Sequence, residues 1–123
     1  MNLVDSSGWL SYFADEPSSK YFHSPLQDTA ALVVPSVTIY EVSKVVLRES
    51  GENEALQVIA AMQKGSVVAL TPRLAISASR LSLQHQLPMA DSIILATAVD
   101  CTATIWTQDS HFEKIPGVNY FQK

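Results

Sequence analysis

The sequence predicts an α/β protein, a three-layer sandwich whose central parallel sheet of four to five strands carries helices on both faces. Three observations predict this fold class. Short, continuous apolar runs such as ALVV (31–34) have the composition of strands that are buried on both faces. These runs alternate along the chain with longer segments of helical pattern, as they do in parallel sheets. Gly or Pro stands at many of the boundaries between them.

The first part of the chain begins with a short strand over residues 1–4, MNLV. A helix over 6–13 follows, and Ser6 or Ser7 is available as its N-cap. Residues 19–30 make a poor helix because a proline interrupts them. The run ALVV is then the second strand.

Two helices are expected in the middle of the chain, over residues 36–50 and 52–64. Gly51 and Gly65 end them, because glycine readily adopts the conformations that terminate a helix. SVVAL (66–70) is expected to be a third buried strand.

The last part of the chain contains two helices and two strands. The helix over 72–86 has Thr71 as its cap and a proline in its first position, which is a favourable start. A second proline begins the helix over 88–100. The remaining strands are ATIWT (103–107) and, to complete a sheet of five, VNYF (118–121).

Composition predicts one intracellular domain that spans residues 1–123. The chain is 47% hydrophobic with few glycines and prolines, which indicates a globular protein. Cys101 is the single cysteine, so no internal disulfide can form and a reducing, cytoplasmic compartment is expected. The first residues lack the pattern of a signal peptide, and the longest apolar stretch, near 93–99, is too short to span a membrane. No membrane partner is expected.

The net charge of −4 argues against a nucleic-acid partner, because phosphate contacts favour basic surfaces. Four acids qualify that argument. Without Asp5, Glu41, Asp91 and Asp109, eight acidic residues remain against eight basic ones. If these four bind a divalent metal together, the negative excess belongs to a metal site and not to a repulsive surface.

Three of these acids have a simple structural alternative. Asp5 directly follows the first strand and could serve only as the N-cap of the next helix, which is the favoured interpretation of this residue alone. Asp109 ends the fourth strand within QDS, a good turn sequence. Glu41 projects off the apolar stripe of its helix near Lys44 and Arg48, and a solvated pair with Lys44 would account for it.

Asp91 is harder to explain as a surface residue. Its helix is apolar nearly all round and is therefore expected to be buried. A buried carboxylate needs a partner or a metal. The alternative, given equal weight, is that the helix dipole satisfies Asp91 in the first turn.

Topology could bring the four acids together. The first and fourth strands end at one edge of a parallel sheet, and the helices that carry Glu41 and Asp91 start near that edge. Converging carboxylates would repel one another unless they bind a cation such as Mg²⁺ or Mn²⁺, both of which take oxygen ligands. Such a cation can activate a water molecule and stabilise a phosphate oxyanion.

Other residue types offer no competing site. The sequence has no Gly-rich phosphate loop, no CxxC, no HExxH and no G-x-S-x-G. Cys101, Trp9 and Trp106 are expected to fill the core, although either tryptophan could stack on a base. Three histidines lack metal-ligand spacing and are expected to be surface residues rather than ligands: His23, His85 and His111.

Four segments follow one another in an order and at a spacing that are typical of one family. They are LVDSSGWLSYF, PSVTIYEVSKVV, LPMADSIILATA and ATIWTQDSHFEKIPGV. With these segments the chain resembles PIN-domain ribonucleases, and in particular the VapC-type toxins of type II toxin–antitoxin pairs. The resemblance covers nearly the whole chain, and the last two segments together are its most specific part.

In that family an acid stands at each of four positions, and the acids bind Mg²⁺ or Mn²⁺ and cleave RNA. The corresponding residues here are Asp5, Glu41, Asp91 and Asp109. The resemblance implies a PIN-like fold. It also implies an endoribonuclease that hydrolyses a phosphodiester with metal-activated water and without a covalent intermediate.

The resemblance also implies two supporting residues. Thr107, in TQD, matches a small hydroxyl position that commonly helps to orient the site, and Ser6 matches the residue after the first acid. Many relatives carry a further acid two positions past Asp109. This chain departs from that pattern because it has His111 there.

Partners follow from the same resemblance. Such toxins act on RNA, usually form homodimers, and are held inactive by a cognate antitoxin. The tail of the antitoxin lies over the acidic groove and often places an Arg in it. DNA is expected to be contacted only through the antitoxin, and the RNA target and the antitoxin class stay open.

Two other functions compete with this one. One is a non-catalytic PIN-like module that only binds a partner protein. It ranks well behind the nuclease, because a module that had lost catalysis would not need all four acids, and all four are present. A phospho-acceptor domain would need adjacent acids after the first strand and a late lysine. Here Asp5 stands alone and Lys114 is poorly placed.

Overall fold

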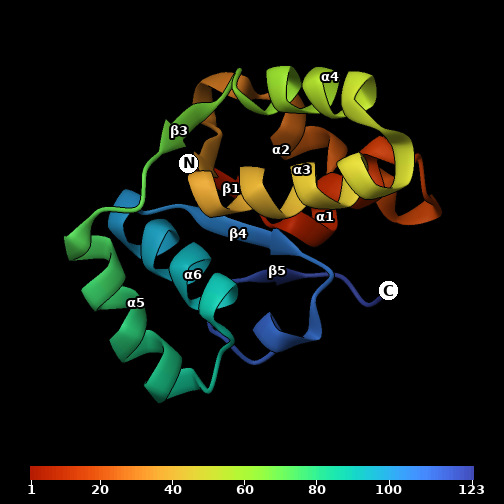
Figure 1. The fold of residues 1–123 in the computed structure, drawn as a ribbon. Coiled ribbons are helices and arrows are strands. Elements are labelled where there is room, and N and C mark those ends of the chain that lie inside the picture. The colour runs from red at the N-terminus through yellow and green to blue at the C-terminus, as the bar shows by residue number, and fades with distance from the viewer.

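The computed structural model describes residues 1–123 and has the predicted α/β architecture (Figure 1). The strands are β1 (Asn2–Val4), β2 (Val33–Pro35), β3 (Ser66–Val68), β4 (Thr104–Thr107) and β5 (Asn119–Tyr120). The α-helices are α1 (Ser6–Phe13), α2 (His23–Gln27), α3 (Ser36–Ser50), α4 (Glu52–Met62), α5 (Pro72–His85) and α6 (Met89–Cys101). Three short 3₁₀-helices are η1 (Pro17–Tyr21), η2 (Thr29–Ala31) and η3 (Ser110–Phe112).

All the strand pairs are parallel, as predicted. β4 lies between β1 and β5 with Val4 opposite Trp106, and β2 pairs with β3. A bridge between Asn2 and Leu32 joins the two groups, so the spatial order is β3-β2-β1-β4-β5. The chain therefore leaves β1 on one side and later returns to pair on its other side. In parallel sheets, ligands bind outside the carboxyl ends of the strands at such a reversal.

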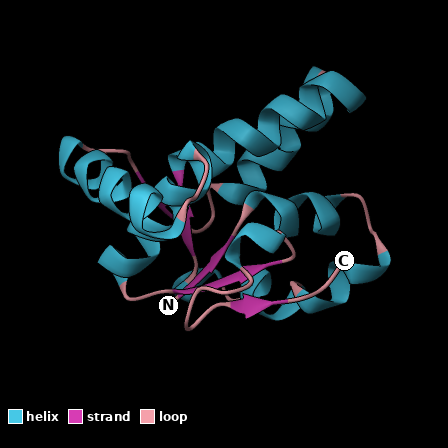
Figure 2. Ribbon diagram, turned by 90° about the horizontal axis from the view of Figure 1, so that it is seen from below, coloured by secondary structure: helices cyan, strands magenta, loops and turns pink.

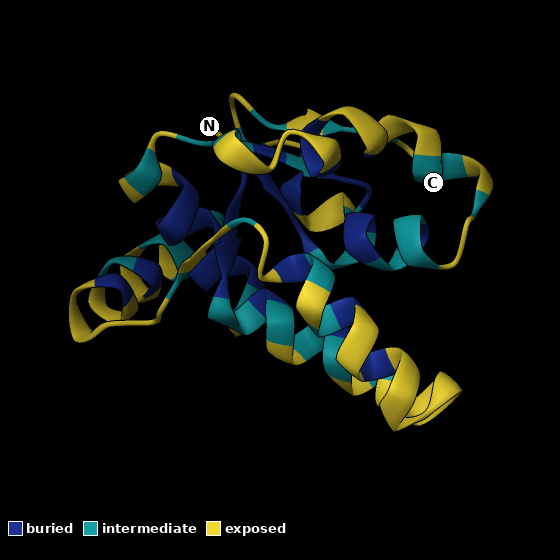
Figure 3. Cartoon of the chain, turned by 90° about the horizontal axis from the view of Figure 1, so that it is seen from above, coloured by how far each residue is buried: buried dark blue, intermediate teal, exposed yellow.

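Alternate residues of the strands face opposite layers of helices. Val4 and Val34 pack in a core with side chains of α1, α2, α3 and α4. Leu3, Val33 and Ile105 pack in a second core against α6, which α5 covers from outside. Figure 2 shows the strands at the centre with helices around them, and Figure 3 shows that the central strands are buried while the outer faces of the helices are exposed. The three-layer arrangement is the predicted one.

The apolar helix α6 is buried along most of its length, as its composition predicts. Residues 91–98 are all buried, and Cys101 at its end is half-buried against the second core. Trp9 is a core residue, whereas Trp106 is half-buried and donates its indole N–H to Asn2 at 3.0 Å. No helix of the molecule is both long and apolar enough to cross a membrane.

Gly8 allows α1 to lie directly on β1. A Cβ at this position would lie 2.5 Å from the Cγ1 of Val4 and 2.8 Å from the ring of Phe22. Any larger residue would push α1 away from the strand. This close contact fixes the turn between β1 and α1, where Asp5 lies.

The segment predicted as a poor helix over 19–30 is not one helix. It consists of η1, α2 and η2 in succession. Pro25 lies in the first turn of α2, where no backbone donor is required, so it belongs to the start of a short helix and does not interrupt a longer one. The second strand consequently begins at Val33, two residues later than expected.

The prediction that the third strand is buried is wrong. β3 has only three residues, and Ser66 and Val67 are exposed. β3 is an edge strand with a neighbour on one side only, so it is less covered than the central strands.

Candidate metal centre

Asp5 is the first residue after β1, and donors of the chain itself surround its carboxylate. The N–H of Gly8 donates to Oδ1 at 3.1 Å, so Asp5, and not Ser6 or Ser7, is the N-cap of α1. The hydroxyl of Ser7 donates to the same oxygen at 2.7 Å. Thr107 donates to Oδ2 at 2.8 Å. The residue is 2% exposed; its bonds to Gly8 and Thr107 are buried, and its bond to Ser7 is partly buried.

Two hydroxyl groups connect Asp5 to the chain that follows β4. Ser7 accepts a hydrogen bond from the N–H of Gln108 at 3.2 Å, and Thr107 accepts one from the N–H of Asp109 at 2.9 Å. Each hydroxyl therefore accepts from the backbone and donates to one oxygen of Asp5. This network holds the ends of β1 and β4 in a fixed relation.

Asp91, Asp109 and His111 form the closest group of metal-ligand side chains. Asp91 lies in the first turn of α6 and is 8% exposed, whereas Asp109 lies just past β4. The Nδ1 of His111 is 2.8 Å from Oδ2 of Asp91 and 3.2 Å from Oδ1 of Asp109. One ligand atom from each of the three side chains lies within 4.8 Å of the others.

Glu41 is half-buried on α3 beside the start of α1. The hydroxyl of Ser6 donates to its Oε1 at 2.5 Å. Lys44 makes no ion pair, and its Nζ lies 5.8 Å from the ring centre of Tyr40. The alternative of a solvated pair between Glu41 and Lys44 is therefore wrong, because a neighbouring helix supplies the partner of Glu41.

The acids influence one another electrostatically. Burial raises the pKa of Asp5 to about 6, and Asp109 adds to this while the three donors to Asp5 oppose it. Burial also raises the pKa of Asp91 to about 6, with further increases from Asp109 and Glu41 and a decrease from His111. These shifts link the four predicted acids in one electrostatic group.

The structure thus brings all four predicted acids to the edge of the sheet where the strand order reverses. Asp91 and Asp109 lie in the closest group, and Asp5 and Glu41 flank it. The capping interpretation of Asp5 is also correct, and it coexists with a place beside Asp109. Their roles in binding a metal remain a prediction.

The two predicted supporting hydroxyls each contact an acid, and two further residues of the site were missed. Thr107 contacts Asp5 and Ser6 contacts Glu41, as described above. Ser7 was considered only as a cap. His111, which stands where many relatives carry a further acid, was expected to be a surface residue rather than a ligand. Its side chain is indeed 55% exposed, but its ring lies against two acids.

The position of His111 follows from a tight turn. Its N–H donates to Oδ1 of Asp109 at 2.9 Å, so the chain folds back on the acid within two residues. An Asp side chain often accepts a hydrogen bond from the backbone two residues later. The sequence QDSH therefore contained a signal that the chain folds back toward Asp109 at His111. His23 and His85 lie elsewhere: His23 is exposed on α2, as expected, whereas His85 is half-buried at the end of α5.

The donor set fits a divalent cation that prefers oxygen ligands. The carboxylates of Asp91 and Asp109 have oxygens within 4.8 Å of each other and therefore repel, and a bound cation would relieve that repulsion. Asp5 already accepts three hydrogen bonds, but two carboxylate oxygens offer about four lone-pair sites, so one stays free for a ligand bond.

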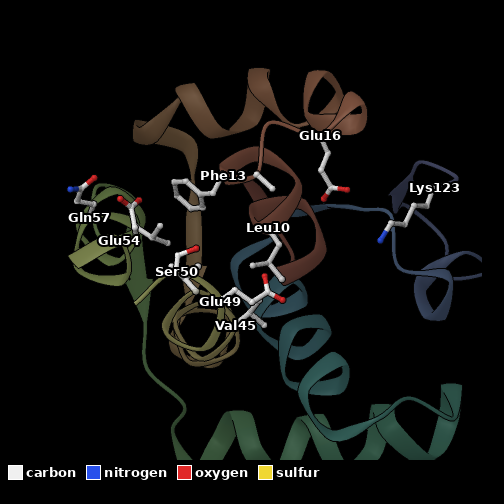
Figure 4. A pocket seen from close by; sticks show the side chains of 12 residues that line it. Leu10, Phe13, Glu16, Val45, Glu49, Ser50, Glu54, Gln57 and Lys123 are labelled. Carbon is white, nitrogen blue, oxygen red and sulfur yellow. The ribbon is translucent and has the colours of Figure 1, made fainter. Parts of the chain in front are cut away.

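One cavity adjoins the acids and a larger one lies apart from them. The first, of about 270 Å³, is lined by Ser6 and Glu41 together with Lys44 and Arg48. The second, of about 540 Å³, lies between α1, α3 and α4 and contains none of the predicted acids. Figure 4 shows its labelled lining residues: Leu10, Phe13, Glu16, Val45, Glu49, Ser50, Glu54, Gln57 and Lys123.

Comparison with known proteins supplies a family and a fold. The sequence model of the PIN domain matches residues 3–118. No curated protein matches the sequence. A toxin–antitoxin complex from Klebsiella pneumoniae contains a similar chain, with 20% identity, a TM-score of 0.81, and coverage of 96% of this chain and 95% of that one.

Two further solved structures have the same fold. One is VapC20 of Mycobacterium tuberculosis, described as a toxin that cleaves the sarcin–ricin loop. It is 16% identical with a TM-score of 0.81, and the alignment covers 97% of this chain and 98% of that one. A DNA-bound VapBC of Salmonella typhimurium is 16% identical with a TM-score of 0.78, and coverage is 98% of both chains.

Proposed function

Because the chain belongs to the PIN domain family, we propose that it is a metal-dependent endoribonuclease and the toxin of a toxin–antitoxin pair, with residues 1–123 acting as one domain. One observation carries the proposal. Asp91 and Asp109 converge with Asp5 and Glu41 at the reversal point of a parallel sheet, where the fold itself does not require four acids.

The four acids hold the cation, Mg²⁺ or Mn²⁺, in this proposal. When bound, such a cation makes a water molecule more acidic and stabilises negative charge on phosphate oxygens. Thr107 and Ser7 orient Asp5, and Ser6 orients Glu41, through the hydrogen bonds given above. These hydroxyls are engaged as donors to carboxylates, which supports direct hydrolysis without a covalent intermediate.

RNA is the proposed substrate. Lys44 and Arg48 follow Glu41 along one side of α3 and share a cavity with it. A phosphate at the acids would therefore have its neighbours along the strand close to two cations, which compensates for the net negative charge of the chain. The solved neighbour described as a sarcin–ricin loop cleaving toxin supports RNA as the substrate class.

A cognate antitoxin is the proposed protein partner. Similar chains occur in a toxin–antitoxin complex and in DNA-bound VapBC complexes, so contact with DNA is proposed only through the antitoxin. The cavity between α1, α3 and α4 suits a segment of such a partner, because half of its lining residues are hydrophobic and three acids also line it (Figure 4). An amphipathic segment with basic residues would complement both.

A homodimer is proposed from the exposed apolar side chains near α5. Ile76 is 57% exposed, Leu83 84% and Met89 76%. Leu83 and Met89 also line an apolar cavity of about 550 Å³ between α5 and α6. Apolar patches of this kind mark protein contacts more often than isolated surface residues do.

The test is cleavage of total RNA by the purified chain in Mg²⁺, in Mn²⁺ and in chelator, together with growth after induction. The proposal predicts cleavage in either metal, none in chelator, and growth arrest. Asp91→Asn should abolish both effects, whereas Asp100→Asn, an acid at the far end of the same helix, should not. Folded parent protein that leaves RNA intact in both metals would contradict the nuclease and favour a non-catalytic binding module.

A further inference from the structure

We propose that His111 is a nitrogen ligand of the bound cation and that it makes this site favour Mn²⁺ over Mg²⁺. This inference rests on the proposed function, because it assumes that Asp91 and Asp109 hold a divalent cation. It goes further by assigning a ligand, and a metal preference, to a residue outside the four acids.

The geometry singles out the ring of His111. Its Nδ1 lies 2.8 Å from Oδ2 of Asp91 and 3.2 Å from Oδ1 of Asp109. The three ligand atoms lie within 4.8 Å of one another, so one ion can contact all three with only small shifts of the side chains. Neither Asp5 nor Glu41 belongs to this closest group.

The backbone holds His111 in that place. Its N–H donates to Asp109 at 2.9 Å, and the next residue, Phe112, is fully buried in the core beneath α6. The turn is therefore anchored on both sides of the histidine. His23 differs, because it lies on the surface and its Nδ1 contacts Gln27 of its own helix.

The second ring nitrogen gives the imidazole the chemistry of a ligand. When Nδ1 faces the carboxylates, Nε2 lies on the other side of the ring. In the tautomer that carries its proton on Nε2, Nδ1 has a free electron pair with which it can bind a metal. The side chain is 55% exposed, so water can solvate that side of the ring.

A nitrogen ligand changes which cation the site prefers. Mg²⁺ favours oxygen ligands and keeps much of its hydration shell, whereas imidazole binds transition metals well, with affinities that rise from Mn²⁺ onward along the first row. Two carboxylates and one imidazole should therefore bind Mn²⁺ more strongly, relative to Mg²⁺, than a purely acidic set.

The experiment measures metal affinity by calorimetry and nitrogen coordination by pulsed electron paramagnetic resonance of bound Mn²⁺. The variants are His111→Ala, His111→Asp and, as a matched control, His23→Ala. We expect His111→Ala to weaken Mn²⁺ binding by about tenfold or more and to weaken Mg²⁺ binding less. His111→Asp should reduce the preference for Mn²⁺, and ¹⁴N modulation of the Mn²⁺ signal should occur in the parent and in His23→Ala only.

Two results separate a failure of this inference from a failure of the proposed function. If Asp109→Asn loses Mn²⁺ binding while His111→Ala keeps the parental affinities and the parental spectrum, the inference is wrong and the metal site stands. If the parent binds neither cation and leaves RNA intact in both, the inference and the proposed function are both overturned.

Discussion

Asp5 and Asp91 are acids at the same edge of the sheet, and burial raises the pKa of each to about 6. Their surroundings nevertheless differ. Asp5 accepts three hydrogen bonds from backbone and hydroxyl donors that hold β1, α1 and β4 together. Asp91 faces a second carboxylate, Asp109, and its one polar contact is the ring of His111.

The difference separates what folding explains from what it does not. A protein with no ligand would benefit from Asp5, because Asp5 caps a helix and connects two strands. The same protein would gain nothing comparable from placing Asp91 beside Asp109, since like charges close together cost free energy and only the half-exposed ring of His111 lies against both. Asp91 and Asp109, called the open pair below, are therefore the part of the site that indicates a bound cation.

The largest expected effect is on catalysis, at Asp109. Asp109→Ala should lower the rate of RNA cleavage by about a hundredfold or more, because a group that holds the charge-stabilising cation is lost. The fold should survive, since Asp109 is only half-buried and contributes little to the core. Cleavage of total RNA, with circular dichroism as a check on folding, measures both.

Glu113→Ala is the matched control, because Glu113 is an exposed acid on the same turn. It should keep the parental rate. A folded Asp109→Ala protein that cleaves as fast as the parent would show that the open pair is not part of the catalytic site.

The second effect is on stability as a function of pH in chelator. Folding raises the pKa of Asp5 and Asp91 from 3.8 to about 6, so the folded state holds protons that the unfolded state has released. Their contribution is fully present below pH 3.8 and is lost as the pH rises through about 6. For the almost fully buried Asp5, a shift of about two pKa units corresponds to about 3 kcal/mol, and the contribution of Asp91 is smaller because water screens it more.

Denaturant unfolding at several pH values between 4 and 7 tests this. The free energy of unfolding should fall less steeply with pH in a double variant, Asp5→Asn with Asp91→Asn, than in the parent. Identical slopes for the two proteins would show that these carboxyl groups titrate normally.

The third effect compares the two acids directly. Asp91→Asn should lose Mn²⁺ binding and, in chelator at pH 7, should be more stable than the parent by about 1–2 kcal/mol, because an unfavourable, partly screened charge is removed. Asp5→Asn should be at least as stable as the parent, since Asn is also a good N-cap. Asp5→Ala removes the acceptor of three donors and should be the less stable of the two changes at that position.

Thermal melting in chelator, with and without Mn²⁺, separates these variants. Unchanged Mn²⁺ affinity in Asp91→Asn would remove Asp91 from the site. A clear loss of stability in both Asn variants would instead favour a purely structural role for these acids.

The smallest effect is expected at Thr107. Thr107→Val keeps the shape of the buried side chain but removes the donor to Asp5, which should cost about 1–3 kcal/mol. Thr107→Ser keeps the hydroxyl and should cost less. Thr97→Val, in which a buried hydroxyl bonded only to its own helix is lost, is the control and should be nearly neutral. If Thr97→Val and Thr107→Val lower the free energy of unfolding equally, the hydrogen bond from Thr107 to Asp5 does not stabilise the protein more than an ordinary buried hydroxyl does.

Much of the fold was predictable because its signals are local. Apolar runs located the strands, and glycine or proline marked the ends of α3, α4 and α5. Parallel pairing then placed Asp5 and Asp109 at one edge. The burial of β3 and the division of residues 17–31 were not predictable in this way, since both depend on what packs beside the segment.

The site shows the same limit. Helical projection put Glu41 near Lys44, but its partner Ser6 comes from another helix. The sequence alone indicates a surface residue at His111, because nothing local relates this position to Asp91, 20 residues earlier in the chain. Both contacts form only when the ends of β1 and β4 and the starts of α1 and α6 meet, which is a property of the tertiary structure.

The most direct test is a crystal of the protein soaked in Mn²⁺, with the ion located by its anomalous scattering. We expect one peak between Asp91 and Asp109, at about 2.0–2.6 Å from an oxygen of each, the range of oxygen-bound divalent ions. Asp5 should keep its three hydrogen bonds in the same crystal. No peak at this edge of the sheet, or a peak held by other residues, would contradict the claim that these acids converge to bind a metal.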